Sequence, residues 1–231
     1  MRRILPILAL LLALALAPSA QARVVELGAD ALPDAKPSCP ETCQGLGFVT
    51  GYMGRSGKAS NPFRVTAAGK IVAFTIGLGK PDQTQVNFFQ NLYGGPPQVR
   101  LSILRKGKTR KTRLTHRLLR HSKLYRVDRY FGSTPTFALD EPLKVAENDI
   151  VALTVPTWAP AFAVNLPRSN WWRSSRRAGQ CGNVSQKAAQ QFLGGLRVYG
   201  CTYKEGARLM YTATYVPNPE PTDGSDRSRR R

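Results

Sequence analysis

Apolar and polar residues alternate along most of this chain, in short runs separated by turn-forming residues. In the run 70–79, four apolar residues recur at a period of two and share one face: Val72, Phe74, Ile76 and Leu78. That spacing predicts a half-buried β-strand, because successive side chains of a strand point to opposite faces. The same period predicts strands over 48–53, 98–105, 112–119, 124–127 and 136–139.

A second pattern marks the middle of the chain. The polar turn Glu147-Asn148-Asp149 is followed by the almost wholly apolar run Ile150–Val155, which predicts a strand buried on both faces. Two further strands are predicted over 196–203 and 207–216. In the last of these, four residues share one face: Leu209, Tyr211, Ala213 and Tyr215.

Helical signals are few. Residues 84–93 predict one short helix, with Thr84 as its N-cap and Gly94-Gly95 ending it, and 185–192 is a weaker second possibility. About nine short strands punctuated by Gly and Pro indicate an all-β sandwich or barrel. We predict an antiparallel, jelly-roll-like β-sandwich with one or two short helices.

The first residues have the pattern of a secretory signal. Arg2 and Arg3 precede the uncharged apolar run 4–17, and Ala20-Gln21-Ala22 matches a signal-peptidase site. A membrane anchor is the alternative, but a spanning helix needs about 20 apolar residues and this run is shorter. We expect cleavage after Ala22 and a secreted product with no membrane span.

The remaining chain suits one domain. Residues 23–36 are expected to be a flexible lead-in, and 37–216 a single β-sandwich long enough to bury a real core. From Pro217 onward the chain is rich in Pro, Asp and Ser and ends in the basic tip 227–231. We expect this tail, 217–231, to be disordered.

The mature chain has four cysteines, Cys39, Cys43, Cys181 and Cys201. Export places them in an oxidising compartment, where paired cysteines form disulfides, and four cysteines allow three pairings. Proximity in the sequence favours Cys39–Cys43 and Cys181–Cys201. A metal site built from all four thiolates is the alternative, although only the first pair has the spacing of a zinc knuckle.

Charge is the strongest compositional signal. The formal net charge is +20, and removal of Arg2 and Arg3 with the signal lowers it to +18. Such a surface attracts polyanions through a field that salt weakens. Outside a cell the candidates are phosphate-rich wall polymers, anionic lipid headgroups, acidic polysaccharides and DNA. The alternative is a solvated basic surface without a partner.

The basic residues concentrate in 105–129, where eleven Lys and Arg accompany one acid, Asp128. The eleven are Arg105, Lys106, Lys108, Arg110, Lys111, Arg113, Arg117, Arg120, Lys123, Arg126 and Arg129.

The order of the strand motifs is informative as well. Gly69-Lys-Ile-Val-Ala-Phe-Thr75 is followed by Val99-Arg-Leu-Ser-Ile-Leu-Arg105, then by 137–143 and Asn148-Asp-Ile-Val-Ala-Leu153. As a loose order of short motifs over 61–216, this resembles uncharacterised secreted jelly-roll-like proteins of actinobacteria. The resemblance implies an exported jelly roll, and the predicted shape is also similar to carbohydrate-binding jelly rolls. A shared fold does not transfer a function.

Segment 158–177 contains the best candidate for a ligand site. It holds all three tryptophans of the chain and several arginines: Trp158, Trp171, Trp172, Arg173, Arg176 and Arg177. Exposed aromatic rings stack on sugar faces or bases, while a guanidinium pairs with carboxylate or phosphate. The other interpretation is burial at an end of the sandwich or against a Cys181–Cys201 bridge. The general burial of tryptophan favours that interpretation for the rings themselves.

No group of residues typical of catalysis is evident. His116 and His121 lie in the basic run without a nucleophile elbow, and we expect surface or strand-edge positions for both. The pair also makes a poor metal site. Four mid-chain acids fall in predicted turns, where such residues are common for structural reasons: Asp140, Glu141, Glu147 and Asp149. No catalytic residue, metal site or cofactor is predicted.

We therefore predict a non-catalytic extracellular β-sandwich protein that binds a cell-surface or cell-wall polymer, namely a glycan. Segment 158–177 is the predicted contact, and 105–129 an electrostatic accessory. Two alternatives stay open: a polyanion-binding adhesin that acts through net positive charge, and a secreted hydrolase with an unrecognised site. No specific nucleic acid is predicted as a partner.

Overall fold

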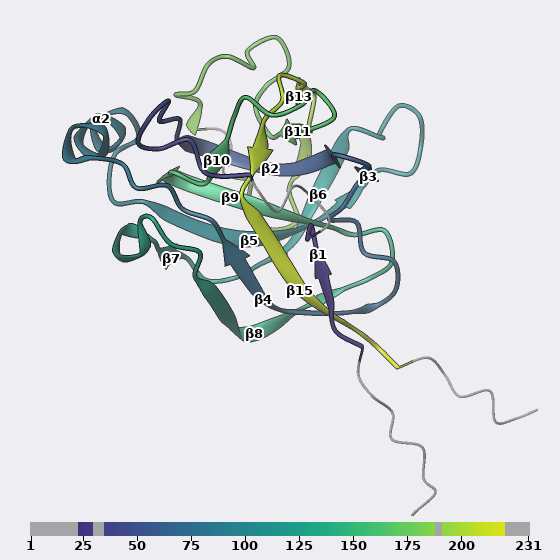
Figure 1. The fold of residues 1–231 in the computed structure, drawn as a ribbon. Helices are drawn as coiled ribbons and strands as arrows, with labels where there is room; N and C mark the ends of the chain where they lie inside the picture. Colours follow the sequence, from purple (N-terminus) through teal and green to yellow (C-terminus); the bar gives the residue numbers. More distant parts are fainter. Residues whose placement is uncertain (1–22, 30–34, 188–190, 220–231) are drawn as a thin grey trace, which may run out of the picture.

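The computed structural model describes residues 23–29, 35–187 and 191–219. The predicted signal 1–22 lies outside the described residues, as does residue 220 onward of the predicted tail. The described chain is mostly β, with antiparallel sheets and one short α-helix (Figure 1). The predicted all-β, antiparallel fold class is confirmed.

The larger sheet has nine strands, and its main path of seven curls into a half-barrel (Figure 1). The path runs β12 (Leu196–Val198), β6 (Thr115–His121), β5 (Gln98–Lys106), β9 (Ile150–Ala159), β2 (Leu46–Ser56), β11 (Trp171–Ser174) and β13 (Cys201–Tyr203). Off the path, β3 (Ala59–Ser60) pairs with β2, and β7 (Tyr125–Arg126) pairs with β5. The predicted single strand over 196–203 is thus two strands, β12 and β13, at opposite edges of the sheet.

The second sheet has four strands, in the order β1 (Val25–Leu27), β15 (Tyr211–Pro217), β4 (Gly69–Ile76) and β8 (Thr136–Val145). A separate pair joins β10 (Phe162–Ala163) to β14 (Arg208–Leu209). Strand β1 corrects the prediction of a flexible lead-in over 23–36 for residues 25–27. It pairs with β15, buries Leu27, and its Glu26 carboxylate accepts hydrogen bonds from the hydroxyls of Thr212 and Thr214.

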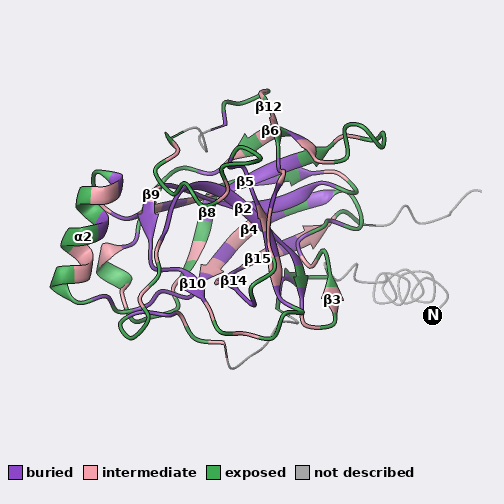
Figure 2. Cartoon of the chain, turned by 90° about the horizontal axis from the view of Figure 1, so that it is seen from above, coloured by how far each residue is buried: buried purple, intermediate pink, exposed green. Residues whose placement is uncertain are grey.

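The main core lies between the two sheets. Val99, Leu101 and Ile103 of β5 are fully buried, as their spacing predicted. The predicted inward face of the last strands is buried too: Leu209, Tyr211, Ala213 and Tyr215. Nearly all of β9 is buried, because its two faces belong to two hydrophobic clusters (Figure 2).

Strand β4 departs from strict alternation. Phe74 and Ile76 are buried as predicted, but Val72 is only half-buried and Ile71 takes the core position. The pairing with β15 matches Tyr215 to Ile71 and the preceding Thr214 to Ala73, which leaves Val72 as an extra residue. Such a β-bulge changes which neighbours point inward, and it corrects the prediction for Val72.

The helix α2 (Gln83–Tyr93) forms where predicted but begins differently. Its N-cap is Asp82 rather than Thr84. The Asp82 carboxylate accepts from the Gln85 backbone N–H at 2.8 Å, and the Gln85 side chain accepts from the Asp82 N–H at 3.0 Å. This reciprocal capping box satisfies two N–H groups that a cap at Thr84 would leave open.

The other helical features are minor. A 3-10 turn, η1, spans Asp128–Tyr130. The weaker helical prediction over 185–192 includes residues 188–190, which lie outside the described residues. Within the described part of the chain, no helix is long and apolar enough to cross a membrane.

Both predicted disulfides are confirmed, Cys39–Cys43 and Cys181–Cys201. The second bridge ties the loop after β11 to the start of β13. Because all four sulfurs are bonded in pairs, the alternative of a four-thiolate metal site is wrong.

Candidate functional site

Trp158, at the end of β9, belongs to the core. Its ring is fully buried and stacks on Phe89 of α2 with the centroids 5.0 Å apart, and Phe131 lies on it at 5.7 Å. The indole N–H donates to the Gly95 carbonyl at 3.2 Å. The helix therefore covers this ring, and the turn that follows the helix accepts from its one polar group, so Trp158 presents no face to a ligand.

Trp172 is buried as well. It stacks on Tyr203 with the centroids 4.3 Å apart, and Phe162 contacts it edge-on. The Tyr203 hydroxyl donates to the carbonyl of Cys181, so this stack lies beside the Cys181–Cys201 bridge. The prediction of an exposed aromatic surface is corrected for Trp158 and Trp172, and the alternative of burial holds for both.

Trp171 is half-buried, because it points to the face of β11 opposite Trp172. It packs on Gly54 of β2, and the Arg173 guanidinium lies 5.4 Å from its ring centroid. Arg173 also donates to the Tyr199 carbonyl. Trp171 and Arg173 are thus neighbouring residues of the predicted site that both keep partial access to solvent.

The two remaining arginines differ. Arg176 is buried, and its guanidinium donates to the carbonyls of Cys181 and Gly47 and to the Tyr203 hydroxyl. Arg177 is exposed. The structure therefore does not bring the six predicted ligand residues together on one surface.

The prediction of two surface histidines is wrong for His116, which is fully buried, whereas His121 is half-buried. His116 belongs to β6, and its ring lies against those of Tyr52 and Tyr199. Its Nδ1 is 2.9 Å from the Leu114 carbonyl and its Nε2 is 3.0 Å from the Tyr52 hydroxyl. Because a carbonyl only accepts, Nδ1 carries the proton and the Tyr52 hydroxyl donates to Nε2.

Burial is the main cause that lowers the pKa of His116 to about 4, and the positive charges of Lys106 and Arg173 contribute to this shift. Burial also raises the pKa of Tyr52 to about 12, which keeps its hydroxyl protonated. This neutral, enclosed pair is structural, since no substrate reaches it.

The structure brings the basic residues around one open cleft with a volume of about 850 Å³. Three segments line it: the hairpin that joins β5 to β6, the turn 147–150, and residues 61 and 64. Six of the lining side chains are cationic and two are carboxylates. The cations are Arg64, Arg105, Lys106, Lys108, Arg110 and Arg113, and the acids are Glu147 and Asp149.

The buried Asp149 lies at the base of this cleft and fixes the position of Arg105. Its carboxylate is fully buried and accepts two hydrogen bonds from Arg105, from Nε at 2.7 Å and from Nη2 at 2.8 Å. The Ala146 N–H donates to the same carboxylate at 2.9 Å. This two-point contact fixes the plane of the Arg105 guanidinium, whose side chain remains 48% exposed toward the cleft.

Backbone contacts hold the other walls. The Asn148 N–H donates to the Val65 carbonyl and the Val65 N–H donates to the Asp149 carbonyl, which ties Arg64 to the 147–150 turn. In the hairpin, the Gly107 N–H donates to Thr115. A side chain at Gly107 would meet the Thr112 backbone at 2.4 Å, so the tight start of the hairpin requires glycine there.

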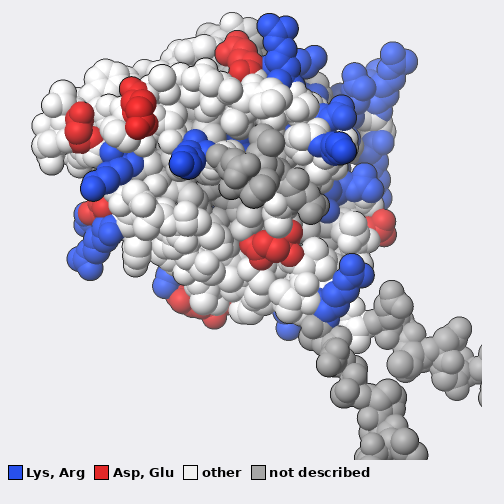
Figure 3. Space-filling model, viewed as in Figure 1, with Lys and Arg blue, Asp and Glu red and all other residues white. Residues whose placement is uncertain are grey.

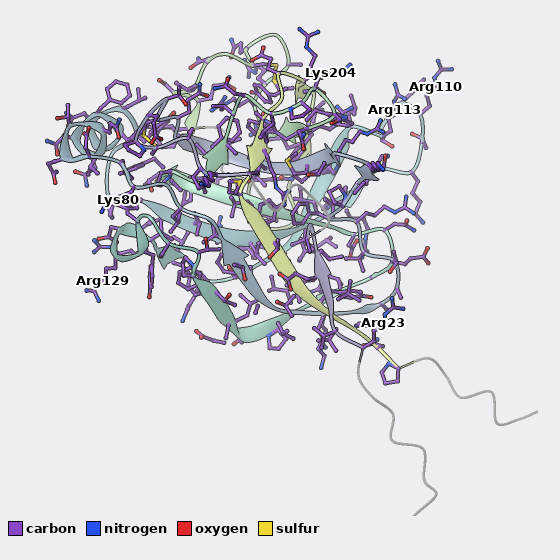
Figure 4. The ribbon with its side chains drawn as sticks, viewed as in Figure 1. Arg23, Lys80, Arg110, Arg113, Arg129 and Lys204 are labelled. Carbon is purple, nitrogen blue, oxygen red and sulfur yellow. A yellow bond between two sulfur atoms is a disulfide. The ribbon has the colours of Figure 1, made fainter. Side chains whose placement is uncertain are left out.

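The cations of the hairpin point into solvent. Figure 4 shows Arg110 and Arg113 extending from the hairpin away from the sheets, and Lys and Arg gather on this side of the molecule in Figure 3. Arg105 is the one of the six cleft cations that forms an ion pair with a carboxylate of the described residues. The cleft is therefore strongly positive.

The predicted carboxylates do not form a catalytic pair. Asp140, in β8 of the four-stranded sheet, is ion-paired with Lys123, and Asp149 is held by Arg105. Glu147 shares the cleft with Asp149 but stays exposed. Within the described residues, no group of three His, Cys, Asp or Glu is placed to hold a metal ion. The arrangement is chemically suited to binding anions.

The sequence predicts only some parts of the basic cleft. The run 105–129 pointed to the hairpin, and Glu147-Asn148-Asp149 was recognised as a turn. Nothing in the sequence placed Arg64 or the turn against the hairpin. The acidic residue directly before a buried strand was the one available signal, since a buried carboxylate requires a cationic partner.

The chain matches no protein-family model, no curated protein and no solved structure. The resemblance to secreted jelly-roll-like proteins of actinobacteria therefore stays a prediction, and functional arguments depend on the residues of this chain.

Proposed function

We propose that this chain is a non-catalytic extracellular protein that binds an anionic cell-surface polymer in the basic cleft. The observation that carries the proposal is the ring of six cationic side chains, one of them oriented by the buried Asp149. Phosphate and carboxylate groups are the natural ligands of such a ring, because guanidinium groups bind them in two-point contacts.

An extended ligand fits this surface better than a small one. The cationic positions continue from the hairpin along β6 to Arg117 and Arg120, both exposed. A polymer with repeating charges contacts many of these positions at once, and each contact releases a counterion. A net charge of +18 on the mature chain attracts the polymer from a distance.

Extracellular location is part of the same proposal. The Arg2-Arg3 start, the apolar run and Ala20-Gln21-Ala22 support export, and two disulfides are typical of proteins in oxidising compartments.

A second candidate function is binding of a neutral glycan at Trp171. The half-exposed ring with Arg173 at 5.4 Å is the observation in its favour, because sugar faces stack on aromatic rings. This surface offers one ring rather than the three that the sequence suggested, so the cleft is the better-supported site.

The test measures binding of the mature chain, 23–231, to a wall polymer rich in phosphate, to a neutral glycan and to DNA across a salt series. The cleft variant carries Lys108→Glu, Arg110→Glu and Arg113→Glu. The matched control carries Arg23→Glu, Lys80→Glu and Arg129→Glu, which changes the charge equally at exposed positions away from the cleft (Figure 4).

We expect the cleft variant to bind the phosphate-rich polymer about tenfold more weakly than the control, because it loses site contacts as well as net charge. Equal losses in both variants would show that net charge acts without a cleft. Retention on the neutral glycan at high salt, lost with Trp171→Ala, would favour the second candidate instead.

A further inference from the structure

Exposed apolar side chains gather at one edge of the larger sheet. Phe192 is 84% exposed, Leu193 58%, Leu196 61% and Val198 50%. We call these four residues the apolar edge. The other large exposed apolar residues of the described chain are dispersed: Val24, Phe88, Leu124, Tyr130 and Val184. Contiguous exposed apolar groups of this kind mark interaction surfaces.

The apolar edge is held firmly against β6. The Gly194 N–H donates to the Leu118 carbonyl at 2.8 Å, and the Leu118 N–H donates to the Gly195 carbonyl at 3.1 Å. Arg117 caps the same turn by donating from Nη1 to the Gly194 carbonyl at 2.6 Å. The turn before β12 is therefore a fixed projection, and its apolar side chains stand out from the fold.

The strand itself is an edge. Strand β12 pairs with β6 on one side, and among the described strands none pairs with its other side. Leu196 lies directly opposite Arg117 in the β12–β6 pairing, and Val198 lies opposite Thr115. Two apolar side chains and a cation thus share one face.

Cations surround the apolar edge. Arg117 and Arg120 of β6 are exposed, and a shallow groove beside Leu193 is lined by Arg120 and Lys144. Glu141 is the one acid that lines this groove. The surface therefore combines protruding apolar groups with a rim of mostly positive charge.

We propose that the apolar edge docks on a membrane surface rich in anionic lipids. Phe192 and Leu193 enter the boundary between headgroups and acyl chains, while Arg117, Arg120 and Lys144 contact the anionic headgroups. Interfacial binding grows with buried apolar area and with attraction to anionic lipid, and this surface supplies both. Phe192, Leu193 and Lys144 do not line the cleft, whereas Arg117 and Arg120 also border the surface proposed for the polymer. Substitution of Phe192 and Leu193 therefore tests this proposal separately from the one above.

Charge complementarity decides against the other occupants of such an edge. Two copies joined through β12 would bring together two Arg117–Arg120 pairs on chains that each carry a net charge of +18, and like charges repel. A soluble anionic polymer would pair with the cations but leave the four apolar side chains in water. A lipid surface matches both features.

The experiment uses the mature chain 23–231 and vesicles of phosphatidylcholine with or without phosphatidylglycerol, separated by sedimentation. Phe192→Ser with Leu193→Ser is the test variant. Phe88→Ser is the matched control, since Phe88 is 59% exposed on the distant helix α2 (Figure 2). Thermal unfolding of each variant verifies the fold.

We expect binding to vesicles with phosphatidylglycerol only, weakened about tenfold in the test variant and unchanged in the control. Arg117→Ser with Arg120→Ser should weaken it as well. As a direct readout, the fluorescence of Phe192→Trp should be quenched by brominated acyl chains.

Absence of wild-type vesicle binding, or equal binding by test and control variants, would overturn the proposal. A wild-type dimer in velocity sedimentation that the test variant abolishes would assign the edge to a second copy instead.

Discussion

Segment 158–177 and the hairpin 105–113 are both rich in residues that bind ligands, yet the fold uses them in opposite ways. In the first, Trp158, Trp172 and Arg176 are buried, and Trp158 and Arg176 donate hydrogen bonds to backbone carbonyls. In the second, the cations project into water around a cleft. Residue type alone therefore does not identify a binding surface, because the same types also build cores.

The physical reason lies in the cost of desolvation. The free energy of the protein falls when a tryptophan ring leaves water, so packing under an adjacent helix or strand is favourable. Burial of a lysine or arginine side chain raises the free energy unless hydrogen-bond partners in the protein replace the water that it loses. The two terminal nitrogens of Arg176 donate to two carbonyls and a hydroxyl, although its Nε has no partner among the described residues. The hairpin offers no such acceptors to Arg110 or Arg113, which stay exposed.

The largest expected effect tests the structural role of the first region. Trp158→Ala removes a fully buried ring that stacks on Phe89, and we expect the free energy of unfolding to fall by about 3–5 kcal/mol. Trp171→Ala, at a half-buried ring, is the control and should cost about 1 kcal/mol or less. Chemical denaturation measures both. A similar small loss of stability in the two variants would contradict a structural role for Trp158.

His116 lies where the two regions meet, and it predicts a pH dependence. Lys106 of the hairpin and Arg173 of β11 add to the burial that lowers its pKa to about 4. At pH values between about 4 and the ordinary pKa of 6.5, this histidine is protonated in the unfolded chain but stays neutral in the folded chain. The contribution of His116 to the free energy of unfolding is therefore fully present above pH 6.5. It declines as the pH falls toward 4, by about 3 kcal/mol in total.

Denaturation of wild type and His116→Gln at pH 7 and pH 4 measures this contribution. We expect the loss on acidification to be smaller in the variant, because glutamine does not titrate. Identical losses would mean that other groups, including the carboxylates, carry the whole acid response.

A smaller effect is expected at the floor of the cleft. Asp149→Asn keeps the size of the side chain but removes the charge that holds Arg105, and we expect a loss of about 2 kcal/mol in the free energy of unfolding. Polymer binding should weaken as well, since the Arg105 guanidinium loses its fixed orientation. Asp140→Asn, which breaks the exposed pair with Lys123, is the control and should be nearly neutral. Unchanged stability and binding in Asp149→Asn would remove Asp149 as the organiser of the cleft.

Local pattern predicted much of the fold. The period-two runs located β2, β4, β5 and β15, the continuous apolar run located β9, and the spacing of the cysteines favoured the two disulfides that form. These features depend on neighbours in the sequence. Where the prediction was wrong, at Val72 and at the cap of α2, a bulge and a capping box had shifted the local register.

The candidate site was less predictable. The hairpin was visible as a charge run, but the cleft also needs Arg64 and the turn at Asp149, which lie far away in the sequence. Long-range pairing of β5 with β9 brings Arg105 to Asp149. No local pattern specifies such a contact.

By itself, then, the sequence determined the fold class, the positions of most strands and the strong positive charge of this protein, and it favoured the disulfide pairs that form, since each depends on composition or short spacing. Tertiary structure alone decided which side chains water reaches. It covered Trp158 with α2, enclosed His116 between Tyr52 and Tyr199, and left Phe192 and Arg110 exposed. Exposure is a property of the elements packed against a residue, and those elements come from distant parts of the chain.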